Sequence, residues 1–259
     1  MLIHLILLIT YQGDCLELIK QLPDKSIDCI ICDPPYEVLN KNNKDAQWDR
    51  IIPFEELWQQ YERVAKDNAA IILFAQGMFT ARLMMSNPKL WRYNLIWQKG
   101  GRCSGFLNAK KMPLREHEDI VVFYRKQPTY NPQMTKCHPY ERNHSRGRQQ
   151  GEQTNRCYGE FGRAEDIITD LKYPKSILNF NRPHPQIHPT QKPVALIQYL
   201  IKTYSNENDL ILDNCVGSGT TAVAAIKEKR HFIGMELNKE YYDIACKRVK
   251  EAKMYQSLF

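Results

Sequence analysis

Short apolar runs recur along the chain, and polar or turn-forming residues bound each of them. Runs of this length and composition are typical of strands that are buried on both faces of a sheet. Seven segments fit the description: residues 3–11, 27–32, 69–75, 93–97, 119–124, 210–212 and 231–235.

Helix-like stretches lie between several of these predicted strands. In the last stretch, Tyr241, Ile244, Ala245, Val249 and Ala252 recur at helical spacing. The stretches are residues 16–22, 54–65, 77–86, 193–204, 220–229 and 239–253. Because buried strands alternate with helices, the sequence predicts an α/β fold with a mostly parallel, seven-stranded sheet and helices on both faces.

The segment 130–187 breaks this alternation. It is rich in Asn, Gln, Pro, Gly and Arg and has little apolar periodicity before Ile167, so we expect an irregular insertion rather than sheet. The chain has 36 Lys and Arg against 29 Asp and Glu, a net charge of +7. Residues 99–163 alone hold 13 basic against 6 acidic residues, which equals the whole net charge. This concentration favours a polyanionic partner over a merely solvated surface.

The eight cysteines are scattered, and the apolar start of the chain resembles neither a signal peptide nor a bilayer span. The sequence therefore predicts a reduced, cytoplasmic, soluble protein. Cys29 and Cys32 lie three apart on a predicted strand and point to opposite faces, so we expect burial rather than a redox or zinc pair. Four further residues match no zinc-finger spacing, and we predict no metal site there. They are Cys137, His138, His144 and Cys157.

A glycine-rich turn follows the predicted strand 210–212. Gly217 and Gly219 let the backbone approach a ligand, and the helix that begins beside them presents free N–H groups. Glu236 ends the next strand, about 20 residues later, where a carboxylate suits ribose hydroxyls. Asp14 also ends a strand, and it either joins this crevice or caps the following helix. These residues alone leave NAD, FAD, S-adenosylmethionine (AdoMet) and the absence of any ligand open.

A second motif, Asp33-Pro34-Pro35-Tyr36, ends the predicted strand 27–32. Prolines have no N–H, so this corner offers a carboxylate and a carbonyl as acceptors without a competing donor. Such a corner suits a planar group that bears an amine, such as a nucleobase, and the ring of Tyr36 offers a stacking surface. If Asp33 and the Pro34 carbonyl accept both amine hydrogens, the nitrogen lone pair becomes free to attack a methyl carbon. The alternative is a strand-end turn with a capping aspartate and a packed tyrosine.

In chain order, Asp33-Pro-Pro-Tyr36, His188-Pro-Thr-Gln-Lys-Pro193 and the glycine motif of residues 213–221 resemble the AdoMet-dependent DNA amino-methyltransferases, in particular their β group. The resemblance covers nearly the whole chain and implies a Rossmann-like methyltransferase sheet. It implies a catalytic half at residues 1–129, a DNA-recognition insertion at 130–187 and an AdoMet-binding half at 188–259. The family usually has Pro-Phe where this chain has Asn214-Cys215, a departure that concerns packing beside the cofactor.

The resemblance also implies roles by position. Asp33, Pro34, Pro35 and Tyr36 would be catalytic, with Tyr36 stacked on the target base. Lys192 would line the methionine end of the cofactor, with capping of the helix at Pro193 as the alternative. The full set expected to hold AdoMet is Asp14, Asp33, His188, Thr190, Lys192, Asp213, Gly217, Ser218, Gly219, Thr220 and Glu236. The residues expected to contact DNA are Lys99, Lys110, Lys111, Arg115, Arg146 and Arg148.

The function implied is site-specific methylation of the N6 amine of a flipped adenine in DNA. Asp rather than Ser before Pro-Pro-Tyr favours adenine N6 over cytosine N4. Two alternatives stay open: methylation of cytosine N4 or of an RNA base, and a nucleic-acid-binding protein with a vestigial AdoMet pocket. A nicotinamide oxidoreductase fits the glycine turn but leaves the proline corner unexplained. We expect DNA as the partner and no membrane association, and the resemblance suggests a homodimer.

Overall fold

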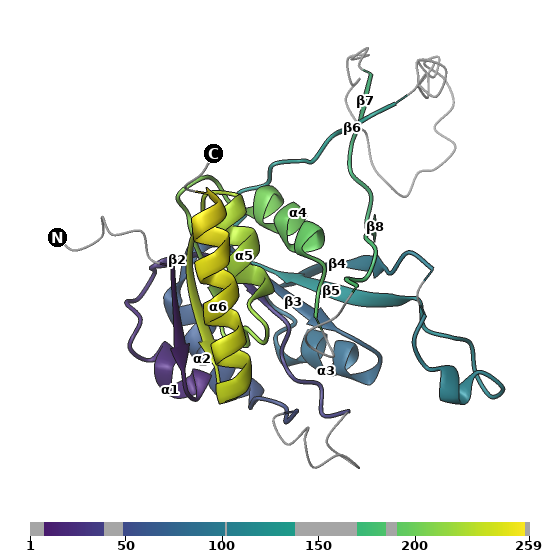
Figure 1. Ribbon diagram of the computed structural model, residues 1–259, viewed down its shortest axis with the longest axis horizontal. Helices are drawn as coiled ribbons and strands as arrows, with labels where there is room; N and C mark the ends of the chain where they lie inside the picture. Colours follow the sequence, from purple (N-terminus) through teal and green to yellow (C-terminus); the bar gives the residue numbers. More distant parts are fainter. Residues whose placement is uncertain (1–7, 39–48, 102, 138–169, 185–190, 257–259) are drawn as a thin grey trace. The chain divides into compact units, whose positions relative to one another are not determined.

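The computed structural model describes residues 8–38, 49–101, 103–137, 170–184 and 191–256. The chain forms two compact units, residues 1–131 with 176–259 and residues 132–175. The larger unit contains an eight-stranded sheet, counted over the described residues (Figure 1).

This sheet has the strand order β1-β10-β9-β2-β3-β5-β4-β8. The strands from β1 to β3 in this order run parallel, β5 is antiparallel to both neighbours, and β8 is parallel to β4. The predicted α/β fold with a mostly parallel sheet is therefore confirmed. The strand bounds are β1 Leu8–Gln12, β2 Ile27–Cys32, β3 Ala65–Ala75, β4 Trp91–Gln98, β5 His117–Phe123, β8 Ile177–Asn179, β9 Leu210–Asp213 and β10 His231–Glu236.

Each predicted strand is present in this sheet, and β2 has the predicted bounds. The predicted number of seven is nevertheless wrong, because β8 adds an eighth strand among the described residues. Strand β8 lies within the segment 130–187, which we expected to lie outside the sheet. It has three residues, of which only Leu178 is buried, so no alternation of apolar and polar positions marks it in the sequence.

Helices follow most strands, close to where the apolar periodicity predicts them. Helix α1 ends at Ile19 rather than at residue 22, because Leu22 precedes Pro23 and a residue before proline disfavours helical dihedrals. The bounds are α1 Cys15–Ile19, α2 Phe54–Val64, α3 Met78–Ser86, α4 Val194–Tyr204, α5 Thr220–Lys227 and α6 Lys239–Gln256.

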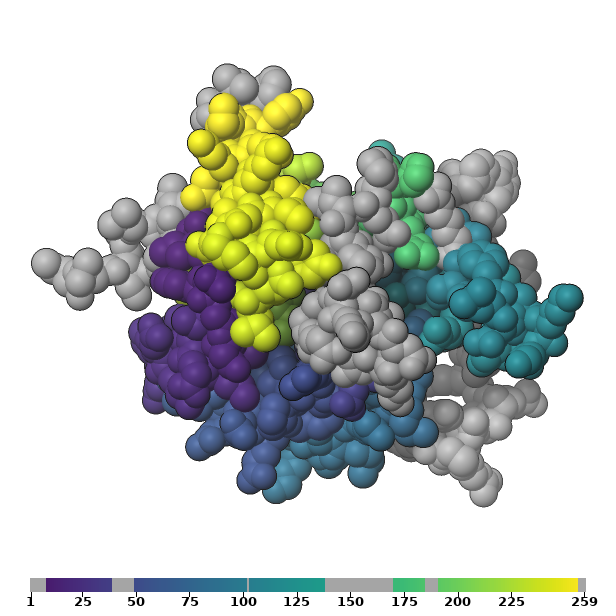
Figure 2. All heavy atoms as spheres, turned by 60° about the horizontal axis from the view of Figure 1, so that its bottom comes forward, coloured from purple at the N-terminus to yellow at the C-terminus, as the bar shows by residue number. Residues whose placement is uncertain are grey.

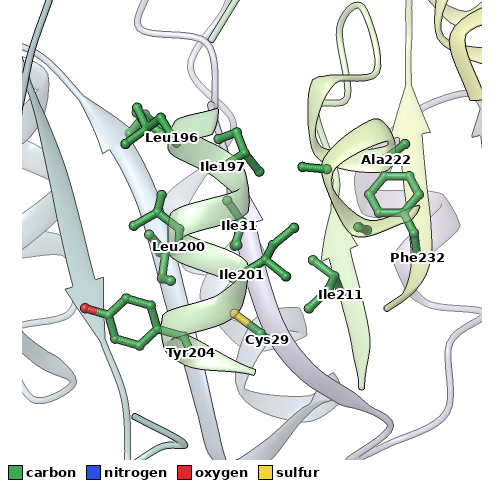
Figure 3. Packing of buried hydrophobic residues seen from close by; sticks show 14 of the residues in the cluster. Cys29, Ile31, Leu196, Ile197, Leu200, Ile201, Tyr204, Ile211, Ala222 and Phe232 are labelled. Atoms are coloured by element: carbon green, nitrogen blue, oxygen red, sulfur yellow. The ribbon is translucent and has the colours of Figure 1, made fainter. Parts of the chain in front are cut away.

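Helices cover both faces of the sheet, as predicted. Side chains from α4, α5 and α6 enter one buried apolar cluster, and side chains from α1, α2 and α3 enter the other. Figure 3 shows Leu200 and Ile201 of α4 beside Ile31 of β2. The central strands are thus shielded from water on both sides, which fixes the positions of the loops at their ends.

The two cysteines of β2 lie on opposite faces of the sheet. Cys29 belongs to the cluster under α4, whereas Cys32 belongs to the cluster under α1, α2 and α3. Both are buried and free, and burial raises the pKa of the Cys32 thiol to about 11. Their predicted structural role is confirmed.

The smaller unit contains a two-stranded antiparallel sheet of β6 (Thr135–Lys136) and β7 (Leu171–Lys172). Residues 138–169 of the predicted insertion lie outside the described residues. This range includes His138, His144 and Cys157. Within the described part of the chain, no helix has the length and apolar character needed to cross a bilayer. The same part holds no cluster of His, Cys, Asp and Glu that could bind a metal ion.

Candidate functional site

The carboxyl ends of four neighbouring parallel strands meet at one edge of the sheet. Strand β2 leads into Asp33, β9 ends at Asp213, β10 ends at Glu236, and β1 is followed by Gly13 and Asp14. Parallel strands point the same way, so these side chains converge on one crevice. There they line a cavity of about 940 Å³.

Nearly all described residues that were predicted to bind cofactor or to act in catalysis line this cavity. Gly219 is the exception, because it lies behind the turn against α6. The residues that share the cavity are Asp14, Asp33, Pro34, Pro35, Tyr36, Lys192, Asp213, Gly217, Ser218, Thr220 and Glu236. The proline corner and the glycine turn, 180 residues apart in the sequence, therefore face a common space.

The glycine turn between β9 and α5 depends on both glycines. Gly217 and Gly219 have φ values of +51° and +82°, in the region that disfavours other residues. A Cβ on Gly219 would lie 3.0 Å from the Cα of Ala245, so glycine there permits close packing of α6. The N–H of Gly217 donates to Glu236 Oε2 at 2.8 Å, which ties the turn to the end of β10.

Arg248 of α6 supports the same turn from behind. Its guanidinium donates to the carbonyl of Ser218 at 2.5 Å and lies 3.5 Å from Thr220 Oγ1. Ser218 and Thr220 are both buried. No pattern in the sequence indicates this role, because Arg248 lies on the polar side of the helix and reaches the turn only after folding.

Glu236 presents a buried carboxylate to the cavity. Besides Gly217, the N–H of Asn238 donates to it, reaching Oε1 at 2.8 Å. Burial raises the pKa of Glu236 above its usual value, although the backbone N–H donors act in the opposite direction. A carboxylate oxygen can accept more than one hydrogen bond, so both oxygens can also accept ligand hydroxyls.

Asp213, at the end of β9, is the carboxyl group of the glycine motif, and its pKa is shifted. Burial raises its pKa to about 7, although Thr221 and the backbone N–H of Cys215 donate to it and lower the pKa. The bond from Cys215 to Asp213 Oδ1 measures 3.0 Å. Near neutral pH, Asp213 therefore exchanges a proton that an exposed aspartate would already have lost.

We expect Asp213→Asn to change how stability depends on pH. Between about pH 4 and pH 7 the folded protein holds a proton on Asp213 that the unfolded chain has released. Stability from this group therefore falls as pH rises, by about 1.4 kcal/mol per pH unit. The free energy of unfolding of the variant minus that of wild type should therefore rise by this amount per pH unit up to about pH 7 and stay constant above it. Urea titrations at several pH values check this, and a constant difference would refute the assignment.

Asp14 combines the two roles that the sequence left open. Its Oδ1 accepts the backbone N–H of Leu16 at 2.8 Å, which makes it the N-cap of α1. It also lines the cavity. Contact with a bound adenine stays a prediction.

The proline corner holds its own catalytic candidates together. The hydroxyl of Tyr36 donates to Asp33 Oδ1 at 2.5 Å, and the Tyr36 ring packs on Phe79 with centroids 4.8 Å apart. Pro34 is buried, and Pro35 lines the cavity beside it. Phe79 thus supports one side of the ring and fixes its orientation.

Asp49 secures the chain beyond the prolines, and sequence reasoning missed it. Its buried carboxylate accepts the backbone N–H groups of Tyr36, Glu37 and Val38 at 2.9, 3.0 and 2.7 Å. The corner is therefore held by one carboxylate that gathers three consecutive donors. No pattern around residue 49 indicates this, since the contact depends on how the intervening chain folds back.

Four charged groups meet beside the corner, two of them on buried lysines. Lys192 Nζ lies 2.5 Å from Asp33 Oδ2 and 3.2 Å from Glu118 Oε2, and Lys99 Nζ lies 2.6 Å from Glu118 Oε1. Lys192 precedes the N-cap residue of α4, Pro193, and its ammonium pairs with the two carboxylates. The side chain of Lys99 is only 4% exposed and borders the cavity, and its predicted contact with DNA stays a prediction.

The pKa values of this cluster shift as buried ion pairs require. Burial raises the pKa of Asp33 above its ordinary value, although Lys192 opposes the shift. Burial acts to lower the pKa of Lys192, but the carboxylates of Asp33 and Glu118 raise it overall. Burial acts to raise the pKa of Glu118, but Lys192 and Lys99 lower it overall. Lys192 and Glu118 therefore stay charged at neutral pH.

A family model described as DNA methylase, of the N6/N4 methyltransferase type, matches residues 27–247. The chain belongs to this DNA methylase family. The match extends from the start of β2 into α6, and it includes both the proline corner and the glycine turn.

Known relatives of this DNA methylase resemble it over most of their length. It is 28% identical to the Type II methyltransferase M.HinfI of Haemophilus influenzae, over 93% of this chain and 68% of the relative. The protein in the crystal structure of the M1.HpyAVI–SAM complex is 23% identical in sequence. The match covers 93% of this chain and 98% of that protein, with a TM-score of 0.61. The structure of the cytosine-N4-specific PvuII DNA methyltransferase is 15% identical in sequence. The match covers 96% of this chain and 90% of that protein, with a TM-score of 0.65. These two structures support the fold.

The basic residues after β4 lie on a segment that projects from the sheet of the methylase. It contains a short 3-10 helix, η3 (Phe106–Asn108), and in Figure 2 it (teal) stands at one edge of the surface, away from α6 (yellow). Lys110, Lys111 and Arg115 are exposed there. Arg115 also reaches the cavity and donates to Gln76 at 3.0 Å. The segment thus connects an exposed basic surface to the site.

Some predicted residues lie outside the described residues. They are His188 and Thr190, expected at the cofactor, and Arg146 and Arg148, expected at DNA. Their roles stay predictions.

Proposed function

We propose that this DNA methylase transfers a methyl group from AdoMet to the N6 amine of adenine in DNA. The observation that carries the proposal is the shared cavity, which Asp33 and Pro34 line together with Gly217 and Glu236. Methyl transfer needs an amine acceptor site and a cofactor site that face one another, and this arrangement supplies both.

The residues of the glycine turn fit the cofactor. Gly217 leaves its backbone open to a close ligand, and the Glu236 carboxylate, fixed by two backbone N–H groups, can accept two neighbouring hydroxyls. Asp14 lines the same cavity and would face the adenine of the cofactor. When bound, AdoMet supplies an electrophilic methyl group on a sulfonium sulfur. The buried, largely acidic set of side chains suits a ligand that carries positive charge.

Asp33 and Pro34 act on the amine. The Asp33 carboxylate and the Pro34 carbonyl each accept one amine hydrogen, which favours a pyramidal nitrogen with a free lone pair. Tyr36, supported by Phe79, stacks on the flipped base. Asp33 does not remove a proton first, because a neutral aromatic amine is far too weak an acid. The nitrogen would gain the methyl group as the bond between that carbon and the sulfonium sulfur breaks, with the sulfur keeping the bonding electrons, and one amine proton would pass to solvent during or after transfer.

Adenine is favoured over cytosine by the Asp that precedes Pro-Pro-Tyr. The test is to incubate DNA of mixed sequence and, separately, RNA with AdoMet that carries a deuterated methyl group, digest each to nucleosides and measure their masses. We expect labelled N6-methyldeoxyadenosine. Labelled N4-methyldeoxycytidine would show that the target is the N4 amine of cytosine instead. Label in RNA alone would exclude DNA as the substrate.

We expect the double variant Lys110→Ala/Lys111→Ala to bind DNA more weakly and with less dependence on salt. Both side chains are exposed on the projecting segment, where they can contact phosphates. The slope of log K against log salt should become shallower by about 2. Fluorescence anisotropy at several salt concentrations measures this. Lys247→Ala/Lys250→Ala on α6 removes equal charge and serves as the control, and equal slopes for the two double variants would contradict the assignment.

A further inference from the structure

Both carboxylate oxygens of Asp33 already accept hydrogen bonds within the protein. Oδ1 accepts the hydroxyl of Tyr36, and Oδ2 accepts the ammonium of Lys192, each at 2.5 Å. Each oxygen keeps a second lone pair. A carboxylate that is tightly paired with an ammonium is nevertheless a poor acceptor for a neutral amine. The function proposed above therefore requires the bond from Lys192 to loosen when the base arrives.

Glu118, on β5, offers Lys192 a second place to bind. Its Oε2 lies 3.2 Å from Lys192 Nζ. Among the described residues, this oxygen is the one buried side-chain polar atom that accepts or donates no hydrogen bond. The ion pair at 3.2 Å is therefore not completed by a hydrogen bond, and Oε2 offers an acceptor directly beside the ammonium.

Glu118 has a second partner that holds it in place, while Lys192 lies within reach of both carboxylates. Lys99 holds the other oxygen of Glu118 at 2.6 Å, and Lys99 Nζ lies 5.5 Å from the centroid of the Trp97 ring. Lys192 Nζ lies 5.0 Å from the centroid of the Phe74 ring and between the two carboxylates. A rotation near the end of its side chain suffices to change partner. The two ammonium groups and two carboxylates remain together, so no net charge leaves the buried site.

We propose that Glu118 is a positioning residue that takes over the ammonium of Lys192 when the amine of the target base hydrogen-bonds to Asp33. The inference rests on the proposed function, since it needs an amine at Asp33. No covalent bond forms or breaks in this exchange, and no proton is transferred. The hydrogen bond of the ammonium passes from Asp33 Oδ2 to Glu118 Oε2, and it returns when the product leaves.

The test compares Glu118→Gln with the wild-type enzyme in single-turnover methyl transfer. The amide attracts Lys192 less, so the ammonium stays on Asp33 and the rate should fall by about 10- to 100-fold. The dissociation constants of AdoMet and DNA should change by less than about threefold, because Glu118 acts on the transfer step. Glu118→Asp keeps the charge but holds it one methylene further from Lys192, so its rate should lie between the rates of Glu118→Gln and wild type. If Glu118→Gln does not fold, Glu118→Asp is compared with wild type, and an unchanged rate overturns the proposal.

A double-mutant cycle separates this role from general support of the fold. If Glu118 acts through Lys192, then Glu118→Gln should change the rate by less than about threefold in a Lys192→Gln background. The full loss in that background, or a Glu118→Gln enzyme that is as fast as wild type, overturns the proposal. Failure of the adenine assignment is distinguishable, because it changes the methylated nucleoside while the exchange, which needs only an amine, still slows in Glu118→Gln.

Discussion

Asp33→Ala is expected to abolish methyl transfer, with a loss of at least about 1,000-fold in the single-turnover rate. The carboxylate is one of the two acceptors that the proline corner offers to the amine, and the Pro34 carbonyl alone cannot hold both hydrogens. Transfer of tritium from labelled AdoMet to DNA measures the rate. Lys192 keeps Glu118 as a partner in the variant, so the protein should fold.

The matched control for Asp33→Ala is Asp24→Ala, which removes the same charge from a side chain that is 73% exposed. This control should keep its activity, and both variants should bind AdoMet with an affinity close to that of wild type in calorimetry. An Asp33→Ala enzyme that transfers methyl groups at a rate near wild type would defeat the proposed mechanism.

Glu236→Ala is expected to weaken AdoMet binding by about 10- to 100-fold, the loss of about 1.5–3 kcal/mol for hydrogen bonds to a charged group. The variant removes the acceptors for the ribose hydroxyls and also frees the N–H groups of Gly217 and Asn238. The geometry of the turn therefore loosens as well. Isothermal titration calorimetry measures the dissociation constant directly.

Glu240→Ala, an exposed acid in the first turn of α6, is the control for Glu236→Ala and should leave the affinity unchanged. Glu236→Gln keeps one acceptor oxygen, so its affinity for AdoMet should lie between the affinities of Glu236→Ala and wild type. Equal affinities of Glu236→Ala and wild type would remove Glu236 from the cofactor site. If wild type itself bound no AdoMet, the chain would be a nucleic-acid-binding protein with a vestigial pocket.

The sequence predicted those parts of the molecule that depend on local patterns. Strand β2 is an apolar run, interrupted only by Asp28, that ends before Asp33-Pro34, and both its bounds and the position of Asp33 at the cavity follow from that run. The same logic placed Glu236 and Gly217, because strand ends in a parallel sheet converge on one edge. The predicted pairing of the proline corner with the glycine turn needed no knowledge of side-chain contacts.

What the sequence could not predict depends on contacts between distant segments. Asp49 reaches three N–H groups only after the chain turns back, and Lys192 meets Asp33 across 159 residues. The resemblance implied that Lys99 contacts DNA, but it did not indicate that the carboxylate of Glu118 and the ring of Trp97 hold this lysine in the cavity. Charge type alone does not reveal whether a lysine is buried with a partner.

The most direct test of the whole account is a crystal structure of the protein with duplex DNA and S-adenosylhomocysteine. We predict a flipped adenine over Tyr36, with its amine nitrogen within about 3.2 Å of both the Asp33 carboxylate and the Pro34 carbonyl. We also predict that the homocysteine sulfur lies in the same cavity, on the side of that nitrogen that faces away from Asp33 and Pro34. A target base bound elsewhere, with Asp33 out of reach of its amine, would contradict the central claim.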